Sequence, residues 1–174
     1  MGMIDWPGIA REHAPLVWRT VYRLLSNEAD AADCFQETFV NAIEVANRQS
    51  VTNWPGLLQK LATSRALDCL RRRIRDRVRL TTPVNWENFA GGDPQPSERA
   101  ETVELAEQLR RLLSQLPSQQ AEVYCLRHLN ELSYEQIGLE LGLSVDAVGV
   151  NLHRARARLR ELVRLQNADE CEQR

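Results

Sequence analysis

The stretch Leu-Ser-Tyr-Glu-Gln-Ile-Gly-Leu-Glu-Leu-Gly-Leu-Ser, residues 132–144, decides the fold of the C-terminal part of this chain. Ser133 and Gln136 have the spacing of a capping box, which opens a short helix. Gly142 can take the left-handed conformation of a tight turn, and Ser144 can cap the helix that follows. The spacing predicts a helix-turn-helix, whose second helix can enter the major groove of DNA.

Arginines follow this motif at close spacing. The run His153-Arg-Ala-Arg-Ala-Arg158 offers several partners for phosphates, whereas an ordinary pair of antiparallel helices needs no such run. We therefore favour DNA binding over a purely structural helix pair. His153 stands beside alternating Arg and Ala residues, which indicates a phosphate or packing contact rather than a metal ligand.

The charge of the chain is unevenly distributed. The net charge is −2, from 22 Lys and Arg against 24 Asp and Glu. Residues 65–79 and 154–160 are nevertheless basic, and residues 87–107 between them are acidic. Because a polyanion responds to local charge rather than to the mean, the two basic segments are candidates for binding nucleic acid.

The rest of the chain also has helical patterning. It is rich in Leu, Ala, Arg, Glu and Gln, and apolar residues recur at helical spacing in 16–25, 32–43 and 56–79. Pro15 falls near the start of the first of these helices and need not break it. A loop is expected over 47–55, where polar and helix-breaking residues gather. The sequence predicts an all-α protein.

Gly and Pro residues divide the chain into two parts. Residues 81–100 contain a glycine pair and three prolines with few periodic apolar residues, as expected of an acidic, flexible linker. We expect a small helical domain over residues 1–80 and a second one, with the helix-turn-helix, over 101–165. The last helix is expected to end near Leu165, so that residues 166–174 form a short disordered tail.

Several classes of protein are disfavoured by composition. The four cysteines are far apart, with no Cys-x-x-Cys and no nearby histidine pair, so free thiols are expected rather than a metal site. The N-terminus lacks the pattern of an export signal, and no apolar run approaches the ~20 residues of a membrane span. We expect a cytoplasmic protein without metal, cofactor or membrane insertion.

The C-terminal residues resemble domain four of the sigma-70 family of RNA polymerase sigma factors. The resemblance rests on Leu116-Pro117, on residues 132–137 and 141–144, and on the run Leu-His-Arg-Ala-Arg-Ala-Arg-Leu at 152–159. It implies recognition of the minus-thirty-five promoter element and contact with the polymerase flap. The candidate residues for this DNA site are Ser144, Asp146, Asn151, His153, Arg154, Arg156 and Arg158.

The start of the recognition helix departs from the family pattern. Gly149, Val150 and Asn151 stand where many relatives have Lys, Ser and Arg. Base recognition there is expected to differ, or to depend on Asn151 and Asp146. Gly149 also lowers helix stability by about 1 kcal/mol relative to Ala. The promoter sequence therefore does not follow from the resemblance.

The segment Asp-Ala-Ala-Asp-Cys-Phe-Gln-Glu-Thr-Phe, residues 30–39, resembles the most characteristic part of sigma domain two. On a helix, Asp33, Gln36 and Glu37 share one face, which by itself indicates only an amphipathic helix. The resemblance implies that these three residues bind the clamp helices of the large subunit of core polymerase.

Residues 54–62 and 66–73 resemble the part of domain two that recognises and opens the minus-ten element. A flipped, single-stranded base needs a pocket, which the loop 48–53 can line, and an arginine-rich helix can hold the backbone. Relatives often have Arg-Asn where this chain has Thr63-Ser64. The candidate residues for this DNA site are Arg48, Asn53, Trp54, Arg65, Arg71, Arg72 and Arg73.

The order of the two resemblances, without the domain that separates them in larger relatives, is similar to the extracytoplasmic-function (ECF) group. It implies core polymerase and promoter DNA as partners, with an anti-sigma factor as a further candidate, since such inhibitors are common in the group. A conventional helix-turn-helix regulator, which would bind operator DNA without polymerase, is one alternative. A DNA-processing enzyme is another, but Ser64 and Asp68 have no nearby histidine in the sequence, and we expect no enzymatic activity.

Overall fold

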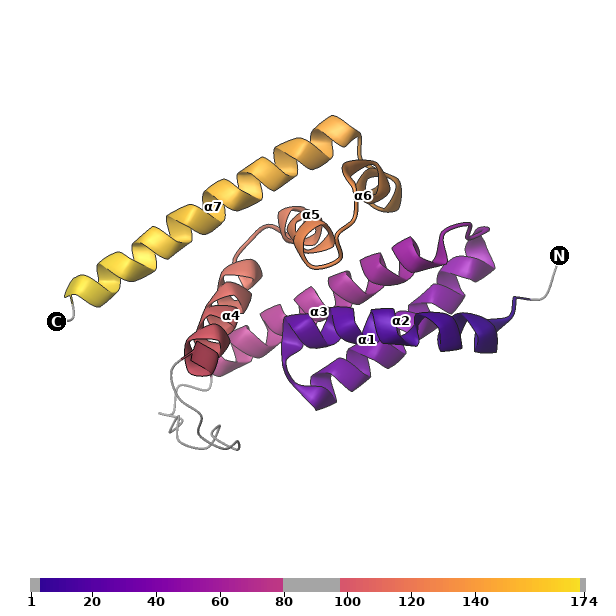
Figure 1. The fold of residues 1–174 in the computed structure, drawn as a ribbon, viewed down its shortest axis with the longest axis horizontal. Helices are drawn as coiled ribbons and strands as arrows, with labels where there is room; N and C mark the ends of the chain where they lie inside the picture. Colours follow the sequence, from indigo (N-terminus) through magenta and orange to yellow (C-terminus); the bar gives the residue numbers. More distant parts are fainter. Residues whose placement is uncertain (1–3, 80–97, 173–174) are drawn as a thin grey trace.

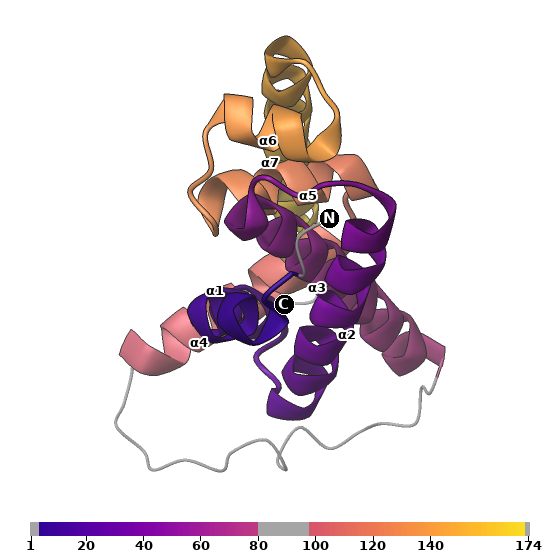
Figure 2. The same cartoon turned by 90° about the vertical axis from the view of Figure 1, so that its right-hand side faces the viewer.

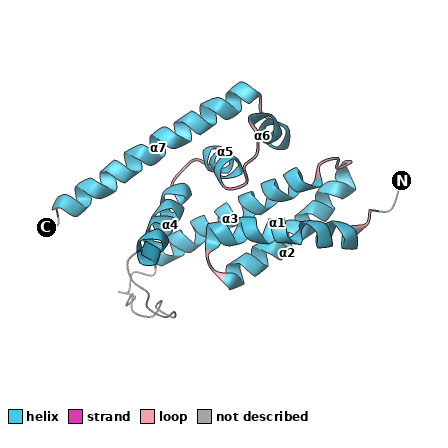
Figure 3. Cartoon of the chain, viewed as in Figure 1, coloured by secondary structure: helices cyan, strands magenta, loops and turns pink. Residues whose placement is uncertain are grey.

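A computed structural model describes residues 4–79 and 98–172, which form seven helices (Figure 1). The helices are α1 Trp6–Leu25, α2 Glu28–Arg48, α3 Trp54–Arg79, α4 Glu98–Ser114, α5 Ser118–His128, α6 Tyr134–Leu141 and α7 Val145–Glu172. Helices, turns and loops make up the described residues, without a strand (Figure 3). The prediction of an all-α protein is confirmed.

Side-chain caps fix the beginnings of the first three helices. In each case the side chain accepts a hydrogen bond from the backbone N–H three residues further on: Asp5 at 3.0 Å, Asn27 at 2.9 Å and Asn53 at 3.2 Å. Such caps satisfy backbone donors that the first turn of a helix leaves free. Because α1 begins at Trp6, Pro15 lies well inside this helix rather than near its start.

Helix α3 is central to the molecule. It packs against α1 and α2 in the N-terminal bundle and also contacts α4, α5 and α6. Helices α5, α6 and α7 lie together above the bundle in the view of Figure 2. The C-terminal helices therefore rest on the N-terminal ones through α3.

One hydrophobic cluster extends from the N-terminal bundle into the C-terminal helices. It joins Val17 and Leu24 of α1 and Leu67 of α3 to Leu113 of α4 and Cys125 of α5, all of which are buried. A second cluster holds the helix-turn-helix together through Val123, Leu126, Leu132, Ile137, Val148 and Leu152. Because burial of apolar surface is the main stabilising term in folding, the shared cluster packs the two parts against each other.

One helix end differs from the sequence-based expectation. Helix α7 continues to Glu172, past Leu165, and Gln166 in this extension accepts a hydrogen bond of 2.9 Å from Gln108 of α4. Helix α5 begins at Ser118, directly after Pro117, which occupies the cap position without a side-chain hydrogen bond. Residues 81–97, most of the predicted linker, lie outside the described residues.

Candidate partner- and nucleic-acid-binding surfaces

An acidic and amide-bearing face of α2 points to solvent. Asp33, Gln36 and Glu37 are exposed, as their spacing predicts, while Cys34 and Thr38 on the opposite side are buried. The three exposed side chains line a shallow hollow of ≈ 420 Å³ together with Val40, Asn41 and Arg65. The structure thus brings the three residues predicted to bind polymerase onto one accessible face.

Aromatic side chains brace this helix from behind. The rings of Phe35 and Phe39 meet edge to face at 5.1 Å, and Phe35 meets Trp18 of α1 at 6.0 Å. Such pairs add to the stability that their buried area supplies. The polar face of α2 is therefore held on a rigid support, as a binding surface requires.

Arg65 belongs to this acidic face rather than to the loop that precedes α3. Its Nε lies 3.9 Å from Glu37 Oε2, and its Nη2 donates a hydrogen bond of 3.3 Å to Asn41. We predicted Arg65 as part of a minus-ten site. The structure instead places its guanidinium among the residues predicted to bind polymerase.

Three other residues of the predicted minus-ten site lie in or beside the loop that precedes α3. Arg48, at the end of α2, and Asn53, which caps α3, are exposed, and Trp54 is half-buried. The Trp54 ring meets Trp6 edge to face at 5.2 Å. Asn53 also donates a hydrogen bond of 2.8 Å to Glu140 of α6, so the helix-turn-helix lies against this loop.

The arginines further along α3 lie far from that loop. At ~1.5 Å per residue, Arg72 is roughly 28 Å from Asn53 along the helix axis. Arg71 forms an ion pair with Asp68 at 3.5 Å and donates a hydrogen bond of 3.3 Å to the carbonyl of Leu116. The predicted minus-ten residues are therefore spread along α3 instead of forming one cluster.

Arg73 is a structural residue in this arrangement. It donates hydrogen bonds to the Leu25 carbonyl at 3.1 Å and to Asp30 at 3.2 Å, and its other nitrogen lies 4.0 Å from Glu107 of α4. Arg72, by contrast, is exposed. Of the three consecutive arginines, Arg72 is the most accessible to a partner.

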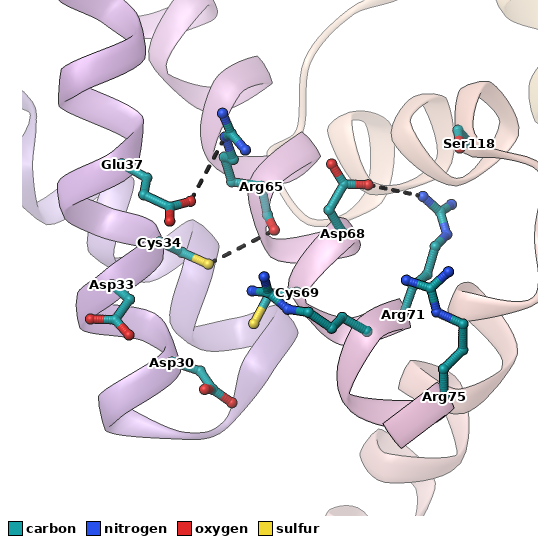
Figure 4. A pocket seen from close by; sticks show the side chains of 11 residues that line it. Asp30, Asp33, Cys34, Glu37, Arg65, Asp68, Cys69, Arg71, Arg75 and Ser118 are labelled. Atoms are coloured by element: carbon teal, nitrogen blue, oxygen red, sulfur yellow. Dashed lines mark hydrogen bonds and ion pairs between the residues drawn. The ribbon is translucent and has the colours of Figure 1, made fainter. Parts of the chain in front are cut away.

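A hollow of ≈ 430 Å³ between α2 and α3 is lined by both acidic and basic side chains (Figure 4). Asp30, Asp33 and Glu37 come from α2, and the arginines come from α3. Two buried cysteines also line it, Cys34 and Cys69. Burial, and next the neighbouring Cys69, raises the pKa of the Cys34 thiol to about 12, which keeps it protonated at neutral pH.

A third cysteine, Cys125 of α5, is also buried. Cys125 is a buried free thiol whose pKa burial raises to about 12, and the Cys171 side chain lies outside the described part. Among the described residues, no group of His, Cys, Asp and Glu side chains could hold a metal ion. No described helix has the length and apolar character to cross a membrane.

The helix-turn-helix has the local geometry that its sequence predicts. The Ser133 backbone N–H donates a hydrogen bond of 2.8 Å to the Gln136 side chain. The Gln136 backbone N–H donates one of 3.2 Å to Ser133 Oγ, which completes the capping box. Gly142 has φ 66°, the left-handed conformation of the turn. A Cβ added at Gly138 would lie 2.7 Å from the carbonyl oxygen of Leu143, so only glycine allows this close approach.

The predicted DNA-binding residues of α7 differ in their availability. Ser144 caps the helix by accepting a hydrogen bond of 3.1 Å from Ala147 N. The Asn151 amide nitrogen donates a hydrogen bond of 2.9 Å to the carbonyl of the same Ala147. Asp146, His153 and Arg154 are exposed.

The last two predicted residues on α7 have protein partners. Arg156 lies 3.1 Å from His128 Nε2, and Arg158 pairs with Glu161 at 2.7 Å. Within the described part of the chain, Arg154 has neither a side-chain hydrogen bond nor an ion pair. It is therefore the arginine of this run that is freest to contact phosphate.

No pattern in the sequence predicted the residues that join the two halves. Asn130 donates to Thr63 at 3.0 Å and accepts from Thr20 at 3.1 Å, while Arg23 donates 2.9 Å to the Leu129 carbonyl. Arg110 of α4 donates to the Arg23 carbonyl at 3.1 Å and to Ser26. The partners in these contacts are far apart in the sequence, so helical periodicity, which relates only nearby residues, does not predict them.

The fold and these surfaces define a helical protein with a helix-turn-helix and, separately, an exposed acidic face on α2. Comparison with known families identifies two regions. Residues 9–79 match the model of sigma-70 region 2, and residues 106–159 match that of sigma-70 region 4.

Two relatives and a solved structure extend this match. The sigma factor CarQ of Myxococcus xanthus is 30% identical over 157 residues, 87% of this chain and 84% of CarQ. The ECF sigma factor SigE of Mycolicibacterium smegmatis is 33% identical over 159 residues, 91% of this chain but only 62% of SigE. The fold is similar to RpoE of Bartonella quintana in complex with the anti-sigma factor NepR, with TM-score 0.55, 21% identity and coverage of 92% and 97%.

This chain belongs to the sigma-70 family of RNA polymerase sigma factors, in its ECF group. Members of the family direct promoter-specific initiation by RNA polymerase and are not themselves catalysts. The expectation drawn from the two motifs in the sequence is confirmed at this level.

Proposed function

We propose that this chain binds core polymerase through Asp33, Gln36 and Glu37 and brings it to promoters read by α7 and by the loop before α3. The observation that carries the proposal is the combination of an exposed polar face on α2 with a complete helix-turn-helix in one chain. Neither feature alone would suffice, because a repressor also has the second.

The polymerase contact is assigned to α2 because its polar side chains are free for a partner. Asp33 and Gln36 are exposed. The Glu37 carboxylate forms an ion pair with Arg65, but at the long distance of 3.9 Å. An exposed pair at this separation contributes little to stability, so it can be exchanged for contacts with clamp helices of the large subunit. Contact of the C-terminal helices with the flap is part of the same proposal.

The minus-ten element is assigned to Arg48, Asn53 and Trp54, with Arg72 as a backbone contact. A flipped base requires stacking and hydrogen-bonding groups on an accessible loop. Arg65, Arg71 and Arg73 are retained as candidates only after rearrangement, because each has a protein partner here. Asn53 likewise has to release Glu140 before it can contact DNA.

The minus-thirty-five element is assigned to the first turns of α7. Arg154 and His153 are exposed and suit phosphates, while Asp146 suits a base donor such as the cytosine amino group. Ser144, Asn151, Arg156 and Arg158 complete the predicted set. We place the protein in the cytoplasm, where polymerase acts, and assign it no catalytic activity. A sigma factor of similar fold forms a complex with an anti-sigma factor, and we propose the same kind of inhibitor here.

The test is reconstitution of the full chain with core polymerase, followed by transcription from genomic DNA. Discrete start sites are expected, and Asp33→Arg with Glu37→Arg should weaken core binding on the order of tenfold or more. Glu12→Arg, an exposed acid on α1, is the matched control and should leave core binding unchanged. Initiation that survives the α2 reversals would contradict the assignment, and operator binding without polymerase would favour a repressor.

A further inference from the structure

The first turns of α7 present an unusually apolar surface to solvent. Val145 and Val150 are 45% and 48% exposed, whereas Val148 and Leu152 are at most 1% exposed. At helical spacing, Val150 lies on the outward face, one turn after the exposed Asp146, whereas Val145 lies at the start of the helix on the side of Leu152. This is the part of a helix-turn-helix that enters the major groove.

Polar side chains in these turns are already occupied or few. Ser144 caps the helix at 3.1 Å, and the Asn151 amide nitrogen donates to Ala147 at 2.9 Å. Asp146 is exposed but can only accept hydrogen bonds when ionised. The outward face therefore has little capacity to donate to guanine or adenine, which is how recognition helices most often read those bases.

Gly149 makes the surface beside Val150 shallow. A Cβ added there would meet only the Tyr134 ring, at 3.7 Å, so nothing in the fold demands a glycine at this position. Without a side chain at this point, the backbone of α7 and the neighbouring Val150 can approach the floor of a groove closely.

The apolar group that a base pair shows in the major groove is the thymine C5-methyl. A valine against a polar base edge would desolvate that edge without a hydrogen bond, which is unfavourable. We propose that Val150 recognises a thymine methyl group in the minus-thirty-five element. This inference rests on the proposed function, and it names the chemical group that the DNA site must contain.

Isolated exposed valines are common on protein surfaces and need no function. Val103 of α4, 67% exposed, is such a residue and supplies the control. What distinguishes Val150 is its place on the outward face at the start of the recognition helix, next to a glycine and one turn after the exposed Asp146.

The experiment uses the holoenzyme, formed from the full chain and core polymerase, on a promoter found by transcription from genomic DNA. Each thymine of the minus-thirty-five element is replaced in turn by uracil, which removes the methyl and keeps base pairing. With the wild-type chain, one or two replacements should weaken binding about fourfold, as expected for loss of one buried methyl-sized group. With Val150→Ala, at least one of these positions should become insensitive to uracil, while Val103→Ala should keep the wild-type profile.

Three results would overturn the inference: an element without thymine, a wild-type profile that is flat across all thymines, or the same profile in Val150→Ala as in the wild type. Each leaves the start sites intact, so the proposed function stands while the methyl contact fails. Absence of any start site would instead remove the proposed function and this inference with it.

Discussion

Asn130 donates a hydrogen bond of 3.0 Å to Thr63 Oγ1, although the two residues are 67 positions apart. Thr63 is fully buried in α3, and Asn130 lies in the turn between α5 and α6. Thr20 of α1 donates to the oxygen of the same amide at 3.1 Å. One side chain of the C-terminal half therefore contacts two hydroxyl groups of the N-terminal bundle.

Replacing Thr63 by Val should destabilise the packed form. The change keeps the shape of the side chain but leaves the Asn130 amide nitrogen without its acceptor, which costs about 1–3 kcal/mol in a buried setting. Urea unfolding of the full chain measures the loss of unfolding free energy. Thr52→Val in the exposed loop before α3 is the control and should change it by less than about 0.5 kcal/mol. Equal effects of the two substitutions would show that the contact contributes nothing.

The two glycines of the helix-turn-helix should respond to alanine in opposite directions. At Gly138 the new Cβ would press on the Leu143 carbonyl at 2.7 Å, and overpacking of this kind costs about 1–3 kcal/mol. At Gly149 it would meet the Tyr134 ring at 3.7 Å, an ordinary contact, and helix propensity should raise stability by up to about 1 kcal/mol. Thermal unfolding of both variants decides the point, and a stabilising Gly138→Ala would contradict the tight turn.

Local signals in the sequence predicted the helix-turn-helix well. Ser133, Gln136 and Gly142 act within one turn of the chain, and the capping box and left-handed turn follow from residue type and spacing alone. The exposed face of α2 could be predicted for the same reason, because Asp33, Gln36 and Glu37 need only helical periodicity to be on one side.

The arrangement of the halves could not be predicted in this way. Arg71 and Arg73 are predicted DNA contacts on the basis of the resemblance and of the arginines that crowd this helix, and this role stays a prediction. In the structure each donates to a carbonyl of another element, Leu116 or Leu25. The end of α7 was also missed, since Gln166 is a polar residue that stabilises the helix only through its contact with Gln108. In both cases a tertiary partner, distant in sequence, decides the role of the side chain.

His128 should make the stability of the fold depend on pH. Burial first, and then the charges of Arg156 and Arg127, lower the pKa of this imidazole, and Arg156 lies 3.1 Å from its Nε2. The unfolded chain therefore takes up the proton more readily, so the contribution to stability is complete above the unfolded pKa of ~6.5 and is lost as pH falls below it.

This prediction is checked by urea midpoints measured between about pH 7.5 and 5.5. The fall in midpoint should be smaller in His128→Gln than in the wild type. His153→Gln, which changes an exposed histidine on α7, should retain the full fall. Identical pH profiles for the wild type and His128→Gln would mean that this site does not control the titration.

The arginines of α7 should differ in their effect on the salt dependence of promoter binding. Arg154 is exposed and has no ion pair within the described part of the chain, whereas Arg158 is held by Glu161 at 2.7 Å. A contact to one phosphate contributes about 0.9 to the slope of log K against log salt concentration. With holoenzyme on its promoter, Arg154→Ala should lower the slope by about that amount and weaken all sequences alike. Arg158→Ala should change it less, because its guanidinium has to leave Glu161 to reach DNA. Should Arg154→Ala keep the wild-type slope, this residue does not contact phosphate and the run from His153 to Arg158 meets DNA differently.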